Sequence, residues 1–263
     1  MRRRTILAGA FAWILVLTAS GIARSEQNRR PSPKPNVKQA PKPMPVPFRV
    51  GESLTYRVSW TAFSNAAALQ LTIPEQRNLW GSQAWHFRAA AHTQTPVRNL
   101  FAIDDQFDSY ADASTLFTRQ YEMHLNEMGK AEDDTIHFAP VGERTGAPPP
   151  LTSVEPGTRD PLDVVYALRT INWAQTPEFR SPVYDGRELY QIVAKRETRS
   201  DVIRVAAGSY SASRIVIQVF QDDKEMTAIR FTVWLADDPA RTPVSFQASL
   251  PFGNVKAELT SIQ

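Results

Sequence analysis

SLTYRVSW, the stretch from Ser53 to Trp60, alternates polar and apolar side chains without a break. Its apolar members fall at every second position, so they would share one face of an extended chain while the polar members share the other. A strand with one apolar and one polar face is typical of an antiparallel sheet that packs on one side and meets water on the other. The stretch therefore predicts a mainly β fold built around such a sheet.

The same period of two recurs along most of the chain. It is found at 69–73, 85–92, 117–125, 211–220, 226–235, 244–248 and 255–259. The connections in the second half are short, which forces neighbouring strands to run antiparallel. Asp185-Gly186 supplies the positive φ angles of a tight hairpin, and Asp222-Asp223 marks a further turn. These patterns predict that the chain closes as a meander.

One segment predicts a helix. Asp160 is suited to accept hydrogen bonds at the N-cap, and Pro161 has the fixed φ of the first helical position. The apolar side of this helix, which runs to about Ile171, would carry Leu162, Val165, Tyr166 and Leu168. A shorter helical turn is expected from Thr95 to Leu100. The predicted fold is a strongly curved antiparallel sheet or open barrel with one central helix.

The first 47 residues read as a leader and a linker. Residues 1–25 combine three arginines, an uncharged apolar run and small residues before Glu26, which is the layout of a signal peptide. An uncleaved anchor is the alternative, because the run is close to the length that spans a membrane. Residues 26–47 are rich in proline and basic side chains and predict a disordered linker. Residues 48–263 would form a single β-rich domain.

Charge and composition exclude several classes of function. The chain has a formal net charge of +3, but much of its basic excess lies in the leader and linker, which leaves the body mildly acidic. Such a surface gains no affinity for nucleic acid by releasing counterions. A membrane would be approached only through the leader and the basic linker. The absence of cysteine excludes disulfides, thiolate catalysis and cysteine ligands for zinc.

Motifs that carry chemistry are sparse. None of the four histidines stands at the spacing that places two metal ligands on one helix face, and there is no phosphate loop or nucleophile elbow. No catalytic residue, metal ligand or cofactor site is therefore predicted, and the chain is not expected to be an enzyme. Asp104-Asp105, between Phe101 and Phe107, is the one unexplained acidic pair and the candidate polar site.

Aromatic side chains on the predicted inner face carry the other candidate site. They would fill an ordinary core, since aromatic residues dominate packing wherever they fall. Alternatively, a strongly curved sheet with a single helix leaves an apolar pocket that binds a hydrophobic or lipid-like ligand. The residues expected to line such a pocket are Tyr56, Trp60, Phe87, Tyr121 and Phe231.

Several stretches together resemble an exported bacterial family known as the domain of unknown function DUF3108. They are Val50–Trp60, Asp160–Arg169, Ala207–Ile215, Val233–Val244 and Pro251–Leu259. The resemblance covers Phe48 to Leu259, although Thr61 to Ala66 lack the glycine-rich turn typical of the family. It implies a mostly β envelope protein without assigned activity or catalytic residues. At the level of fold it is similar to the curved half-barrels of periplasmic lipoprotein carriers of the LolA and LolB kind.

Three functions remain open on the sequence alone. The first is an exported periplasmic module that binds a hydrophobic or lipid-like ligand without catalysis. The second is an envelope scaffold or assembly factor that acts through a protein partner, tethered to the inner membrane if the leader is kept. The third is a hydrolase in which Asp104, Asp105 and an imidazole supply acid and base.

Overall fold

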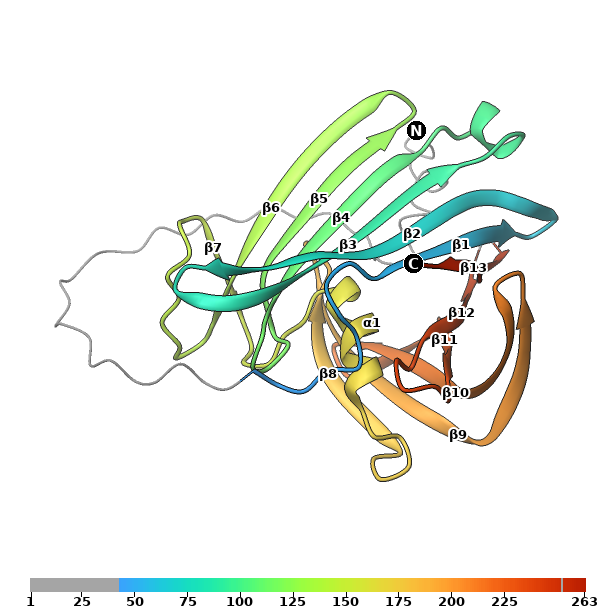
Figure 1. Cartoon of the computed structure of the whole chain (residues 1–263). Helices are drawn as coiled ribbons and strands as arrows, with labels where there is room; N and C mark the ends of the chain where they lie inside the picture. The colour runs from blue at the N-terminus through green and yellow to red at the C-terminus, as the bar shows by residue number, and fades with distance from the viewer. Residues whose placement is uncertain (1–42, 252) are drawn as a thin grey trace, which may run out of the picture.

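The computed structural model describes residues 43–251 and 253–263, and it contains thirteen strands in one sheet with the helix α1 (Pro161–Thr170) on its concave side (Figure 1). The leader and most of the linker lie outside the described residues. The first seven strands are β1 (Ser53–Trp60), β2 (Phe63–Leu79), β3 (Ser82–Thr93), β4 (Asp104–Asp112), β5 (Thr118–Glu127), β6 (Lys130–Pro140) and β7 (Leu151–Val154). The others are β8 (Glu178–Tyr184), β9 (Leu189–Val205), β10 (Gly208–Gln221), β11 (Lys224–Ala236), β12 (Pro243–Leu250) and β13 (Gly253–Ile262).

The sheet order is β7-β6-β5-β4-β3-β2-β1-β13-β12-β11-β10-β9-β8. Every pair is antiparallel except β6 with β7. β1 and β13, the first and last strands of the chain, pair in the middle of the sheet, and Ser53 and Gln263 exchange two backbone hydrogen bonds of 3.0 and 2.9 Å. The two edges are β7 and β8, and α1 lies between them in the chain. The prediction of a strongly curved antiparallel sheet or open barrel with one central helix is confirmed.

α1 begins where the sequence predicts. The Asp160 carboxylate accepts hydrogen bonds from the backbone N–H groups of Leu162 (2.8 Å) and Asp163 (2.9 Å). Within the described residues α1 has ten residues, and no helix there is both long and apolar enough to cross a membrane. The shorter turn expected between Thr95 and Leu100 is a 3-10 helix, η3 (Val97–Asn99).

Aromatic rings fix α1 against the sheet. Tyr166 stacks on Phe87 of β3 with 3.8 Å between the ring centroids, and Phe48 meets Tyr166 edge to face at 5.3 Å. At the other end of the helix, the fully buried Arg169 guanidinium donates to both carboxylate oxygens of Glu52 at 2.6 and 2.8 Å. It also donates to the Ala240 carbonyl at 3.0 Å. These contacts hold the helix in a single orientation.

The residues just before the sheet differ from the expected linker. Met44 and Val46 pack against the core, and the Met44 N–H donates to the Ala113 carbonyl at 2.9 Å. Residues 43–47 therefore rest on the domain, although the sequence places them in a disordered linker. The reason is that Met44 and Val46 alternate with prolines, so an extended segment turns both apolar side chains to one side.

The turns behave largely as their sequences suggest. Between β8 and β9 the expected tight hairpin is wrong: the connection has four residues, Asp185 to Glu188, and of the Asp185-Gly186 pair only Gly186 has a positive φ, +103°. Asp222 and Asp223 connect β10 to β11 with φ angles of 48° and 61°. Between β1 and β2, where the glycine-rich turn of the resembling family is missing, Thr61 adopts φ 50°. A non-glycine residue in the left-handed region thus makes the first hairpin.

Candidate functional site

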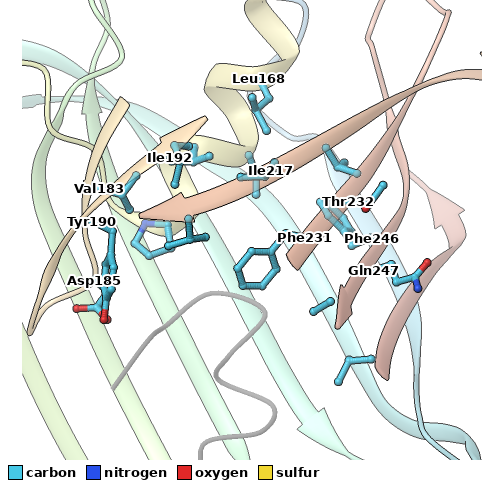
Figure 2. Close-up of a pocket in the computed structure, with 17 residues that line it drawn as sticks. Leu168, Val183, Asp185, Tyr190, Ile192, Ile217, Phe231, Thr232, Phe246 and Gln247 are labelled. Carbon is cyan, nitrogen blue, oxygen red and sulfur yellow. The ribbon is translucent and has the colours of Figure 1, made fainter. Parts of the chain in front are cut away.

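An apolar cavity lies between α1 and the inner face of the second half of the sheet (Figure 2). Its volume is about 110 Å³. The helix contributes Pro161, Val164, Val165 and Leu168, and the strands β8 to β13 and the turn after β8 contribute the rest. The remaining lining residues are Val183, Asp185, Tyr190, Ile192, Ile217, Val219, Phe231, Thr232, Val233, Phe246, Gln247, Ala248 and Val255.

Strand pairing explains why a space is left there. Ala248 of β12 stands directly opposite Phe231 of β11 on one side and Val255 of β13 on the other. All three side chains line the cavity. Because alanine ends at its Cβ, it leaves a gap between two larger neighbours that α1 does not fill. Figure 2 shows Leu168 projecting from the helix toward the strands that carry Ile217 and Phe231.

The walls suit an apolar guest. Asp185 is the only ionisable carboxylate among the lining residues, and none of them is lysine, arginine or histidine. One Asp185 oxygen accepts hydrogen bonds of 2.8 Å each from the backbone N–H groups of Arg187 and Glu188, so it is occupied by its own turn. An apolar cavity of roughly 150 Å³ in another protein stays dry and accepts benzene. This cavity therefore matches a ring or part of an acyl chain rather than a whole lipid.

The mouth of the cavity is reached from solvent. Val165, Phe231 and Phe246 line the cavity and are only half buried, whereas Val164, Leu168 and Val255 are buried. Half-exposed aromatic rings at a pocket entrance are accessible contact surface for a guest. The cavity is therefore open to solvent on one side.

The five aromatic residues expected to line a pocket separate into two groups. Phe231 lines the cavity. The other four lie outside its walls: Tyr56, Phe87 and Tyr121 are fully buried in the core, and half-buried Trp60 packs against Phe63 with 6.2 Å between ring centroids. The Tyr56 hydroxyl donates to the Pro243 carbonyl at 2.7 Å, which ties this ring to the core.

Most residues of the cavity walls could not be predicted from the sequence, because they are aliphatic and resemble ordinary core residues. Ile192, Ile217, Val219 and Val255 follow the same alternation as any core strand. The one signal that could have directed attention to them is Ala248, a small residue between large ones on an inner face. That signal becomes specific only after the strand pairing is known.

Asp104 and Asp105 do not form a paired acid site. Asp104 is exposed and accepts two hydrogen bonds from Arg98 at 2.8 and 2.7 Å, which lower the pKa of Asp104. Asp105 points to the inner face and is buried, and this burial raises its pKa to about 6 although it accepts a hydrogen bond from the Asn126 N–H at 3.0 Å. His92 stands opposite Asp104 in the strand register. Neighbouring strand residues face opposite sides of a sheet, so the two carboxyl groups are separated by the backbone.

Buried acids also anchor the start of α1. Asp160 accepts hydrogen bonds from Ser109 of β4 at 2.5 Å and Thr118 of β5 at 2.7 Å besides capping the helix. Asp163, in the first turn of the helix, is fully buried 3.5 Å from the Arg159 guanidinium, and burial raises its pKa well above the usual value. The bonds of Asp160 are satisfied within the protein, so this cluster positions α1 over the sheet.

Comparison with known proteins supports the fold. The model of a family described as a protein of unknown function, DUF3108, matches residues 55–260. A β-barrel-like protein of the domain of unknown function DUF1849 from Brucella abortus is similar in structure, with 9% identity, a TM-score of 0.52, and coverage of 81% of this chain and 97% of that one. No curated protein matches the chain.

Two further solved structures are more distant. A candidate lipoprotein from Parabacteroides distasonis shows a TM-score of 0.40 at 11% identity, covering 83% of this chain and 98% of that one. A candidate exported protein with a YmcC-like fold from Bacteroides fragilis shows a TM-score of 0.30 at 10% identity, with the same coverage of 83% and 98%.

Proposed function

The chain belongs to the DUF3108 family, whose function is unknown, and from this premise we propose that it is a non-catalytic binding protein for the apolar part of a lipid-like ligand. The ligand occupies the cavity between α1 and strands β8 to β13. The observation that carries the proposal is the apolar gap above Ala248, which the surrounding aliphatic and aromatic side chains leave open.

The chemistry of the cavity supports binding rather than reaction. General acid–base catalysis needs a side chain whose pKa lies near the working pH and which reaches the proton that it transfers. Among the lining residues, Asp185 and Tyr190 are the only side chains that could exchange a proton, and the pKa of Tyr190 is raised by burial. An apolar guest also offers no bond for such groups to attack.

We place this binding function in the cell envelope. The support is the leader-like sequence of residues 1–25, with its arginines followed by an apolar run. A carrier or sensor of apolar groups is useful where lipids cross an aqueous space. An exported domain without cysteine must rely on its core, and the long aromatic and aliphatic core of this sheet meets that need.

Binding is tested with the full chain and phenylnaphthylamine, an apolar dye that fluoresces when it leaves water. We expect saturable binding of one dye per chain, with displacement by palmitic acid and by hexadecane. Ala248→Leu would exclude about three carbons of guest, and at about 0.8 kcal/mol per buried CH₂ this weakens binding at least tenfold. Ser249→Leu, on the opposite face of the same strand, is the matched control and should bind as the unmodified chain does.

Two results would contradict the proposal. One is fluorescence that rises without saturation, which indicates dye on the general surface. The other is equal affinity of the unmodified chain and Ala248→Leu, which places the dye elsewhere.

A further inference from the structure

A second group of polar side chains lies on the outer face of the sheet, away from α1. Asp108 of β4 stands directly opposite Glu122 of β5, and His124 follows two residues after Glu122 on the same face. The alternate residues Phe107 and Tyr121 point to the inner face, where their rings lie 6.2 Å apart. Strand register therefore brings the carboxylates of Asp108 and Glu122 close to the imidazole of His124.

The distances suit a small metal ion. His124 Nε2 lies 3.6 Å from Glu122 Oε2 and 4.0 Å from Asp108 Oδ2, and the ligand atoms of the three residues all lie within 4.8 Å of one another. Ligand atoms around a tetrahedral zinc ion are about 3.4 Å apart, because each bond is about 2.0–2.2 Å long. Small side-chain movements would close the remaining gap. Glu122 and His124 are partly exposed, which leaves a fourth position for water.

Each of the three residues has a partner that orients it. His124 Nδ1 lies 2.6 Å from Asp133 Oδ1, and a carboxylate at this nitrogen fixes the proton there and leaves Nε2 free as a ligand. Asp108 Oδ1 accepts from Arg88 Nε at 2.7 Å and lies 2.5 Å from His86 Nε2. Gln120 donates to the other oxygen of Glu122. Metal-bound histidines almost always have such a carboxylate or carbonyl behind them.

The charge of the cluster favours a dication. Asp108 is 1% exposed and faces Glu122. Two further carboxylates are near: Asp133 lies on the next strand, opposite His124, and Glu75 lies 3.9 Å from Nδ1 of His86, the histidine that contacts Asp108. Among the described residues, Arg88 Nε donates to Asp108 Oδ1 at 2.7 Å and Arg77 lies 3.7 Å from Glu75, while Gln106 donates to Asp108 Oδ2 at 2.6 Å. Acids this close repel one another, and a bound divalent ion would relieve that repulsion.

We propose that Asp108, Glu122 and His124 form a binding site for a divalent transition metal of the zinc class, with Asp133 as the positioning residue for His124. An imidazole with two carboxylates is a ligand set for zinc, whereas magnesium prefers octahedral oxygen ligands and retains its water. The site is on the opposite face from the apolar cavity and does not depend on a ligand there.

Zinc binding is measured by calorimetric titration of the full chain without a histidine tag. We expect one saturable zinc site and no magnesium site. His124→Gln should weaken zinc binding more than 100-fold, and Asp133→Asn, which removes only the orienting carboxylate, 10- to 100-fold. His92→Gln changes an exposed histidine outside the cluster and should leave the affinity within twofold.

A spectroscopic signature distinguishes a defined site from loose surface binding. Cobalt in place of zinc should give the intense visible absorption of a four-coordinate ion, and His124→Gln should abolish it. If circular dichroism shows that His124→Gln is unfolded, Glu122→Gln takes its place as the ligand variant. Absence of a saturable zinc site, or equal zinc affinity of the folded ligand variant and the unmodified chain, would overturn the proposal.

Discussion

Filling the cavity should stabilise the protein, because the space above Ala248 is lined mainly by apolar side chains. Ala248→Leu adds three carbons between Phe231 and Val255. Each buried CH₂ is worth about 0.8 kcal/mol, and ordering a leucine costs about 0.5–1 kcal/mol. The net gain in the free energy of unfolding is therefore about 1.4–1.9 kcal/mol, which corresponds to a rise in Tm of roughly 3–8 °C for a domain of this size.

Urea denaturation, followed by tryptophan fluorescence, measures this gain as a higher midpoint urea concentration with an unchanged slope of free energy against urea concentration. Ala257→Leu is the matched control, since Ala257 is also on the inner face, fully buried, and absent from the cavity walls. Overpacking a filled core costs about 1–3 kcal/mol, so the control should lose stability. If Ala248→Leu is destabilised as much as Ala257→Leu, the cavity is not an empty space and the reasoning fails.

Three further substitutions test the supporting structure. Asp105→Asn should raise the free energy of unfolding by about 2 kcal/mol at pH 8 and leave it unchanged near pH 4. The reason is that the folded state, in which the pKa of Asp105 is raised to about 6, disfavours the ionised carboxylate, so the unmodified chain loses stability as pH rises through 6. Equal changes in urea unfolding at both pH values would contradict this prediction. Arg169→Met leaves the Glu52 carboxylate without its partner and should cost about 3–5 kcal/mol, part of which Glu52→Gln in the same chain restores. Asp160→Ala removes the helix cap and the acceptor of two buried hydroxyls, so thermal unfolding should show a loss of about 2–3 kcal/mol, and Asp160→Asn a smaller one.

Local patterns predicted the elements well because they depend on neighbouring residues. Alternation from Leu54 to Trp60 requires only that one face is buried, and Asp160-Pro161 begins a helix whatever it packs against. The same reasoning separates Asp104 from Asp105, since adjacent strand residues face opposite sides. Such features follow from the geometry of an extended or helical chain.

The cavity could not be predicted in this way, because it depends on contacts between distant segments. Phe87 and Phe231 both alternate correctly, yet Phe87 stacks on Tyr166 while Phe231 borders an open space. Which ring meets the helix is decided by where α1 crosses the sheet. The polar cluster at Asp108 was missed for a related reason, since its members lie on two strands whose register the sequence does not state.

Pairing of β1 with β13 joins two strands that lie far apart in the sequence and are therefore synthesised at different times. Until residues 253–262 have been synthesised, β1 has one bare edge and the first seven strands cannot meet the last six. The two parts of the sheet can therefore join only after β13 has been made, so a ribosome-bound chain that lacks residues 253–262 should not reach the complete sheet. β13 (Gly253–Ile262) is thus the strand on which the continuity of the whole sheet depends.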